Sequence, residues 1–387
     1  MRTIGVVTVA RSDYGISLPI LRGIKSSNAL RLHLIVSGMH LSPEFGRTIT
    51  EIENDGFNIA DRVEMLLSSD SPEGIAKSIG LGTIGFSQLY TRIDLDVLLV
   101  LGDRFEMYAA ALAALPFKLP VAHVHGGEIT YGAIDDALRH SITKLSHLHF
   151  VATAEYAQRV EQLGEEKWRI MVSGAPSLDN QHSMNLMTHD ELSNRYGFSL
   201  DLPLLLVTFH PVTLEYEQTK WHMAELLAAL DDAKMSVVFT MPNADTNGRI
   251  IRHIIEDYVQ NNATACAVDN LGVRPYFSFM NVAAAMVGNS SSGIIESPSF
   301  KLPVINVGTR QHGRVKSANI IDVDYNRHDI LAGIRKAVDS GFISSLDELV
   351  NPYSNGGASD IIVDRLQSVS IDEKLVMKRF VDMNRVT

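Results

Sequence analysis

The chain has 387 residues, a formal net charge of −11 at pH 7, an apolar content of 45% and one cysteine, Cys266. This length fits two domains better than one core, and the acidic balance argues against nucleic acid as a partner because phosphate backbones need a basic face. A lone cysteine excludes an internal disulfide and fits a reducing compartment. With no signal-peptide pattern and no membrane-spanning apolar run, we expect a cytoplasmic protein without a membrane partner.

The first half of the chain alternates predicted strands with predicted helices. Continuous β-branched and apolar runs are typical of strands buried on both faces, and the alternation predicts a mostly parallel sheet. The predicted strands are residues 4–9, 32–36, 96–101, 120–124, 148–151 and 170–172, and the main helices are 73–92, 107–115 and 154–163. The helix at 73–92 contains Gly74, Gly80, Gly82 and Gly85, which fit either close packing or mobility.

The second half repeats the pattern and ends in a tail. Strands are predicted at residues 204–209, 237–241, 265–268, 303–307 and 320–323, and helices at 217–230, 248–260, 276–284 and 328–339. We therefore predict an α/β protein with two Rossmann-like domains, residues 1–175 and 176–360. The tail, residues 361–387, is expected to be helical and to pack back on the first domain.

Polar residues recur where the predicted strands end. Open α/β sheets bind ligands beyond the carboxyl ends of their strands, so two such domains facing each other would bring these residues to one cleft. The residues at these positions are Arg11, Asp103, His123, His125, His210, Asn243, Ser290 and Arg310.

The first of these positions suit phosphate binding and proton transfer. Arg11 could bind a phosphate with two hydrogen bonds, or simply pair with Asp13 at the surface. Asp103 could act as an acid or base in a cleft, or only cap the next helix. No G-x-G-x-x-G follows the first strand, which argues against a nicotinamide or flavin cofactor, and we expect no cofactor.

The segment from His123 to Glu128 concentrates titratable groups. Alternation along a strand predicts that His123 and His125 lie on the same side. Two histidines and Glu128 resemble a metal-binding set, but no third ligand has a recognisable spacing, so we expect no metal. A cluster for proton transfer is the preferred interpretation, because histidine and carboxylate pKa values are readily tuned toward neutrality.

Residues 286–297 predict an anion site. An apolar run ends in Gly288-Asn289, three serines follow, and Glu296 comes after the start of a helix. Small residues between a strand and a helix expose backbone N–H groups that bind phosphate, while a carboxylate further along suits a sugar diol. We interpret the segment as a site for a nucleoside diphosphate with Glu296 on the ribose. The alternative is that Ser290 or Ser291 only caps the helix.

These motifs together resemble a known family, the hydrolysing UDP-N-acetylglucosamine 2-epimerases, especially the branch that serves sialic and legionaminic acid synthesis. The resemblance covers residues 3–340 and rests on motifs in the family's order: Arg11-Ser12-Asp13-Tyr14, Gly102-Asp103-Arg104, His123-Val124-His125-Gly126-Gly127-Glu128, Ile134-Asp135-Asp136, His210-Pro211-Val212-Thr213, Gly288-Asn289-Ser290-Ser291 and Gly308-Thr309-Arg310. It implies a GT-B arrangement of two domains around a cleft, a homodimer, and cleavage of UDP-N-acetylglucosamine to UDP and N-acetylmannosamine through 2-acetamidoglucal.

The resemblance also implies roles for residues. Asp103 and Asp135 match catalytic acids, and Glu296 matches the ribose contact. The diphosphate contacts match His210, Arg11, Ser290 and Ser291, further nucleotide or sugar contacts match Arg310 and Asn243, and the same motifs make Asp13, Arg104 and His123 binding candidates.

One position departs from the family pattern. Many relatives have a catalytic glutamate where this chain has His125, so either His125 or Glu128 takes the proton-transfer role, or the substrate differs. UDP-diacetylbacillosamine and GDP-N-acetylglucosamine are then alternative substrates. A glycosyltransferase of the same fold and a non-catalytic nucleotide-sugar sensor are alternative functions.

Overall fold

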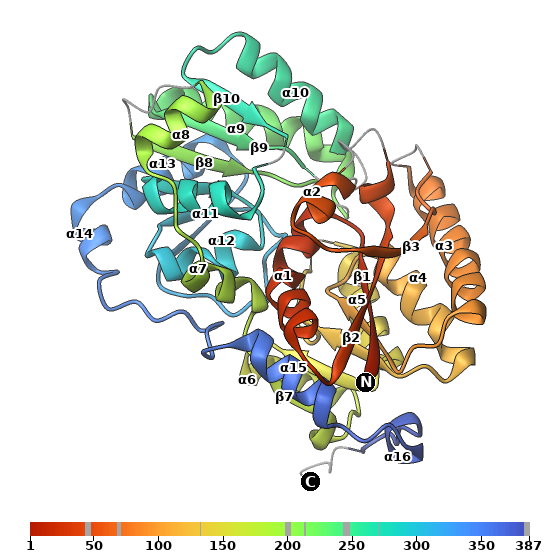
Figure 1. Ribbon diagram of the computed structural model, residues 1–387. Coiled ribbons are helices and arrows are strands. Elements are labelled where there is room, and N and C mark those ends of the chain that lie inside the picture. The colour runs from red at the N-terminus through yellow and green to blue at the C-terminus, as the bar shows by residue number, and fades with distance from the viewer. Residues whose placement is uncertain are drawn as a thin grey trace. The chain divides into compact units, whose positions relative to one another are not determined.

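The structure of the chain is a computed structural model (Figure 1). It describes residues 1–42, 48–67, 71–131, 133–197, 203–212, 214–242, 248–269 and 271–382. The chain divides into two compact units. Unit 1 comprises Met1–Glu128, Asp135–Asn180 and Tyr353–Thr387, and unit 2 comprises Ile129–Ile134 and Gln181–Pro352.

Unit 1 is built on a seven-stranded sheet in the order β3-β2-β1-β4-β5-β6-β7, and all its neighbouring strands are parallel. Its strands are β1 (Arg2–Thr8), β2 (Leu30–Ser37), β3 (Ile59–Val63), β4 (Val97–Leu101), β5 (Val121–Val124), β6 (Leu148–Val151) and β7 (Ile170–Val172). The helices of this unit are α1 (Arg11–Ser26), α2 (Ile49–Asn54), α3 (Pro72–Arg92), α4 (Phe105–Ala114), α5 (Asp135–Leu145), α6 (Ala154–Gln162), α15 (Ala358–Ser368) and α16 (Glu373–Val376). Helix α7 (Asp179–Ser183) spans the boundary between the units in the chain.

The strand order of unit 1 reverses between β1 and β4. Val6 of β1 pairs with Leu34 of β2 on one side and with Leu99 of β4 on the other. The carboxyl ends of β1 and β4 are therefore adjacent, at the position where open α/β sheets bind ligands. Arg11 and Asp103 follow these two strands, so the sheet topology places both at one edge of unit 1.

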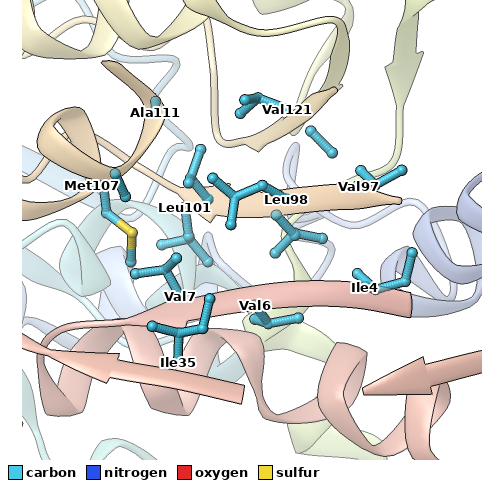
Figure 2. Close-up of a cluster of buried hydrophobic side chains, with 14 of the residues drawn as sticks. Ile4, Val6, Val7, Ile35, Val97, Leu98, Leu101, Met107, Ala111 and Val121 are labelled. Carbon is cyan, nitrogen blue, oxygen red and sulfur yellow. The ribbon is translucent and has the colours of Figure 1, made fainter. Parts of the chain in front are cut away.

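A continuous apolar core fixes these strand ends. Figure 2 shows part of the core, where Val6, Leu98 and Val121 come from three neighbouring strands and Met107 comes from α4. All four side chains are fully or almost fully buried. Truncating a buried side chain of this size costs about 2–5 kcal/mol, so the sheet register, and with it the loop positions, is strongly held.

The glycines of α3 serve close packing at two positions. A Cβ atom on Gly82 would lie 2.5 Å from Met65 and one on Gly85 would lie 2.8 Å from Val63, whereas Gly80 has no neighbour within 4 Å in the described part of the chain. The first two distances are too short for real contacts. Close packing against β3 and the loop after it therefore explains these two residues.

The tail, which was expected to be helical over residues 361–387, is described as far as residue 382. It forms α15 and then the short α16, with Val369 extended between them and Asp372 capping α16 through its side chain. Ile362, Val369 and Leu375 belong to the core of unit 1. The packing of these side chains into the core of unit 1 therefore accounts for the break between α15 and α16.

Unit 2 contains a six-stranded sheet in the order β10-β9-β8-β11-β12-β13, again with parallel neighbours. Its strands are β8 (Leu204–Thr208), β9 (Ser236–Thr240), β10 (Ala265–Val268), β11 (Ala285–Gly288), β12 (Val304–Val307) and β13 (Ile320–Val323). Its helices are α8 (His189–Tyr196), α9 (Thr219–Ala233), α10 (Gly248–Gln260), α11 (Val273–Val282), α12 (Ser292–Ile295), α13 (Arg327–Ala337) and α14 (Ser340–Ser344). The order reverses between β8 and β11, which brings the loops after them together.

No helix in the described ranges is long and apolar enough to cross a membrane.

Candidate functional site

In unit 1, Asp13 shapes the turn after β1. Its Oδ2 accepts hydrogen bonds from the Thr8 Oγ1 (2.9 Å) and the Val9 amide (2.8 Å), and its Oδ1 accepts one from the Ala10 amide (2.5 Å). Burial raises the pKa of Asp13 to about 6, and the Val9 hydrogen bond opposes that rise. Asp13 is thus neither a surface partner of Arg11 nor exposed to a ligand, contrary to the sequence interpretation. It holds the turn from which Arg11 opens α1.

Arg139 of α5 links three parts of the site. One guanidinium nitrogen, Nη2, donates to Asp103 Oδ2, and the other, Nη1, donates to the His125 carbonyl oxygen (3.0 Å) and lies 3.5 Å from Glu128 Oε2. Arg139 and Glu128 are buried, whereas the Asp103 side chain is 21% exposed. The network therefore fixes Asp103 at the rim of unit 1, where it remains accessible to a substrate. The N-cap position of α4 is Arg104, so Asp103 does not cap that helix.

His123 has a structural role. Its Nε2 lies 2.7 Å from the Gly102 carbonyl oxygen and its Nδ1 lies 3.1 Å from Thr143 Oγ1. Burial lowers the pKa of His123 to about 3, so the ring is neutral near pH 7. Both nitrogens are engaged within the protein, which contradicts its assignment to ligand binding. His123 instead positions the residue before Asp103.

His125 does not continue the alternation of β5. The strand ends at Val124, and His125 has a φ of +63°, a left-handed conformation that is rare for residues other than glycine. The prediction that His123 and His125 share one side of the strand is therefore wrong. The His125 Nδ1 lies 2.6 Å from Glu128 Oε1, and both side chains are buried.

Two further unit 1 candidates, Arg104 and Asp135, lie at the starts of helices α4 and α5. Arg104 Nε lies 3.3 Å from Glu106 Oε2, an ion pair that is almost completely buried. Asp135 is the first residue of α5 and is partly exposed. It precedes Arg139 by four residues, which places both on the same face of the helix.

In unit 2, Asn289 connects the ends of three strands. Its Oδ1 accepts from the His210 amide (2.7 Å) and its Nδ2 donates to the His210 carbonyl oxygen (2.9 Å). The Asn289 carbonyl oxygen accepts from Arg310 Nη1 (3.1 Å) and from Gln311 Nε2 (2.7 Å). Asn289 thus ties the loops after β8, β11 and β12 into one assembly.

The start of this loop requires glycine. Gly288 has a φ of +133°, and a Cβ atom there would lie 2.0 Å from the Thr208 carbonyl oxygen. Any side chain would force β11 away from β8. The close approach of these two strands therefore depends on Gly288.

Helix α12 is only four residues long, and the chain continues as the 3-10 helix Ser297–Phe300. Ser290 Oγ accepts from the Ser292 amide (3.3 Å), while the Ser291 hydroxyl makes no cap hydrogen bond to the described residues. A helix of four residues has only a small dipole. Its N-terminus therefore contributes little to phosphate binding, although the sequence predicted phosphate binding at the start of a helix. The hydroxyls of Ser290 and Ser291 remain as the candidate anion-binding groups of this loop.

Tyr276 and Glu296 flank this loop. Burial raises the pKa of Tyr276 to about 12, and hydrogen bonds with Ser292, Thr208 and Ser290 oppose the rise. Tyr276 is therefore protonated at neutral pH and can donate a hydrogen bond. Glu296 is buried at the end of α12 and acts electrostatically on Tyr276.

The sequence interpretation gave no role to Arg139, Asn289 or Tyr276. Arg139 could have been suspected from its position four residues after Asp135, on the same face of a helix. Asn289 could have been suspected because it lies inside the Gly288-Asn289-Ser290-Ser291 motif. Tyr276 carries no comparable signal, because its contacts come from residues of other elements. Asn243 lies outside the described residues.

In the described part of the chain, no three or more His, Cys, Asp or Glu side chains are arranged to hold a metal ion. Each unit instead gathers polar groups beyond the carboxyl ends of a parallel sheet. Two such units in one chain define an α/β protein of the GT-B type.

Comparison with known proteins identifies a family within this class. A family described as UDP-N-acetylglucosamine 2-epimerase matches residues 22–367. Among solved structures, the UDP-GlcNAc 2-epimerase from Neisseria meningitidis bound to UDP-GlcNAc superposes with a TM-score of 0.81 at 18% identity, covering 95% of this chain and 99% of that one.

Two curated relatives are similar over most of their length. The GDP/UDP-N,N'-diacetylbacillosamine 2-epimerase (hydrolyzing) of Campylobacter jejuni is 42% identical over 330 residues, covering 85% of this chain and 86% of the relative. The UDP-N,N'-diacetylbacillosamine 2-epimerase (hydrolyzing) of Legionella pneumophila is 36% identical over 378 residues, covering 98% and 99%. The chain belongs to the UDP-N-acetylglucosamine 2-epimerase family.

Proposed function

We propose that this protein is a hydrolysing 2-epimerase, which converts a UDP-linked 2-acetamido sugar to UDP and the C2 epimer of the free sugar. The observation that carries the proposal is the network in which buried Arg139 joins Asp103 to Glu128 and the His125 loop. Epimerisation at C2 requires proton transfer to and from carbon, which needs at least two titratable groups.

The chemistry proceeds in two stages. A base removes the C2 proton, the C1–O bond to UDP breaks, and the electron pair forms the C1=C2 double bond of a glycal. An acid then returns a proton to the other face of C2, and water adds its hydroxyl at C1 and releases a proton. Within this scheme Asp103 and Asp135 are the carboxylates assigned to the sugar, and Asp103 is held ready by Arg139.

Unit 2 is assigned the nucleotide. His210, Ser290 and the Arg310 guanidinium supply polar or cationic groups for the diphosphate, whose departure they would assist by stabilising negative charge. Glu296 is assigned to the ribose diol. Arg11 of unit 1 and Asn243 complete the proposed set of binding residues.

The preferred substrate is UDP-N,N'-diacetylbacillosamine. The two curated relatives named above act on this sugar by their names, and they share 42% and 36% of aligned residues with this chain. UDP-N-acetylglucosamine, with N-acetylmannosamine as product, is the second candidate because of the family description. Both are 2-acetamido sugars on UDP, so the chemistry at C1 and C2 is the same.

The test is incubation of the protein with each nucleotide sugar alone, followed by NMR of the products. We expect release of UDP and a free sugar with inverted configuration at C2. A glycosyltransferase without an acceptor releases little UDP, and a sensor releases none. Release of a sugar that keeps its C2 configuration would also refute the proposal.

A further inference from the structure

We propose that His125 Nε2 is the atom that takes the C2 proton, with Glu128 as the positioning residue that holds the imidazole for this task. This inference rests on the proposed function and assigns a role within it. It resolves which of the two residues at the end of β5 touches the substrate.

The geometry assigns the two ring nitrogens different roles. His125 Nδ1 lies 2.6 Å from Glu128 Oε1, and a carboxylate can only accept, so Nδ1 carries the hydrogen. In the neutral ring this leaves the lone pair on Nε2. Nε2 is buried and has no hydrogen-bond partner among the residues that the structure describes. A buried nitrogen without a partner is unfavourable for stability, and this one belongs to the residue whose carbonyl oxygen Arg139 links to Asp103.

Glu128 is badly placed to take the proton itself. Its Oε1 is used by His125, and its Oε2 faces Arg139 Nη1 at 3.5 Å. Its side chain is 1% exposed, compared with 6% for His125. A carboxylate held in this way orients an imidazole and stabilises its protonated form, the role that acids play in hydrogen-bonded catalytic dyads.

The backbone at His125 supports the assignment. The residue adopts a left-handed conformation, and its carbonyl oxygen accepts from Arg139 while its amide donates to the Phe150 carbonyl oxygen (2.9 Å). Strained positions of this kind persist where the surroundings over-determine them, and they cluster at functional sites. Because Nε2 is buried in this structure, the proposal requires the groups that cover it to move before substrate binds.

The step balances without any co-reactant. The C2–H bond breaks, the proton goes to Nε2, and the C–H electron pair forms C1=C2 while UDP leaves with the C1–O pair. The imidazolium later returns its proton to solvent. The proton added to C2 on the other face comes from a second acid, Asp103 or Asp135.

A second buried pair in unit 1 provides a matched control. His149 of β6 has its Nε2 3.0 Å from Glu165 Oε2, and its Nδ1 has no hydrogen-bond partner in the described ranges. The His149–Glu165 pair resembles the His125–Glu128 pair in burial and in the distance between the two side chains. His149 and Glu165 are not among the residues that Arg139 links to Asp103. Its substitution measures the purely structural effect of losing a buried His–Glu pair.

The experiment compares pH profiles of kcat for UDP release. The charged or titratable groups that face His125 are Glu128 and Arg139, with His123 on the strand before it and Asp103 beyond Arg139. We expect Glu128→Gln to lower kcat by about 10²- to 10⁴-fold. We also expect the acidic limb of the kcat pH profile to move about one pH unit downward, because the imidazolium form of His125 loses its carboxylate partner. The expected change in UDP affinity is less than threefold.

His125→Glu and His125→Gln complete the set. The glutamate variant keeps a base and is expected to retain turnover with its acidic limb moved to lower pH, because a carboxylic acid is a stronger acid than an imidazolium ion. The glutamine variant is expected to lose turnover by about 10²- to 10⁴-fold and to lose deuterium exchange at C2. His149→Gln is expected to leave the acidic limb unchanged.

The outcomes separate this inference from the proposed function. If the wild-type protein releases neither UDP from any UDP-linked 2-acetamido sugar nor GDP from any GDP-linked one, the proposed function fails. If wild-type turnover is present but His125→Glu keeps the wild-type acidic limb, or His125→Gln keeps C2 exchange, His125 is not the base. If Glu128→Gln behaves like His149→Gln, Glu128 is only structural.

Discussion

Replacing Asn289 by alanine tests whether one amide holds the nucleotide side of the site together. The substitution removes the acceptor for the His210 amide and the donor for the His210 carbonyl oxygen, two hydrogen bonds of 2.7 and 2.9 Å between buried groups. Leaving a buried polar group without its partner costs about 1–3 kcal/mol, so we expect a loss of roughly 2–4 kcal/mol in the free energy of unfolding. For a domain of about 150–250 residues this lowers Tm by roughly 4–16 °C.

Asn319→Ala provides the matched control. Asn319 is equally buried, and its Nδ2 donates to Ser297 Oγ (2.9 Å) and to the Leu302 carbonyl oxygen (2.7 Å) at the amino end of β12. We expect a similar loss of stability in the two variants. Only Asn289→Ala should disturb the loops after β8, β11 and β12, and we expect it to weaken UDP binding at least about tenfold, or ~1.4 kcal/mol.

The assays are urea unfolding for stability and isothermal titration calorimetry with UDP for affinity, both at a temperature where each variant is folded. Equal UDP affinities for the two variants would refute the view that Asn289 organises the nucleotide loops. Equal stability of Asn289→Ala and the wild type would refute the energetic argument.

Three further predictions follow from the same geometry. Asp103→Asn should abolish UDP release and keep UDP affinity within about threefold, as measured by calorimetry; retained turnover would remove Asp103 from the chemistry. Glu296→Ala should weaken UDP binding more than it slows the chemical step, and the reverse result would exclude a ribose contact. Although burial alone would raise the pKa of Glu165, its hydrogen bond with His149 and the charges of Lys378 and Lys144 lower it to about 2. Ionised Glu165 therefore stabilises the fold above its ordinary pKa, and this stabilisation disappears as pH falls from about 4.5 toward 2. Glu165→Gln should lower Tm at pH 7 and flatten the decline in that acidic window; an unchanged decline would contradict the linkage.

The strands were the most predictable part of the fold. Parallel strands covered on both faces need apolar residues at most positions, so residues 204–209 could be recognised without any long-range information. The apolar run at residues 265–268 also predicted a strand, although that strand lies at the edge of its sheet and only Ala265 is buried. The structure places these strands at Leu204–Thr208 and Ala265–Val268. The tail was less predictable, because the extended Val369 between α15 and α16 depends on packing against a core made of residues far away in the chain.

The site could be predicted only as a set of positions. Asp103 and Ser290 were selected as candidates because polar residues directly after buried strands mark the ligand-binding edge of a parallel sheet. The roles of Asp13 and His123 could not be predicted, because burial decides them. Asp13 binds its own turn and His123 binds the Gly102 carbonyl oxygen, and neither side chain remains available to a ligand.

Local sequence therefore determined which residues form strands, which form helices and which stand at the strand ends. Only the tertiary structure decided the strand order, the left-handed conformation of His125, and the bonds from Arg139 to Asp103 and from Asn289 to His210. The physical reason is that propensity and periodicity act over a few residues. These bonds join groups 36 and 79 positions apart, which become neighbours only when the sheets assemble.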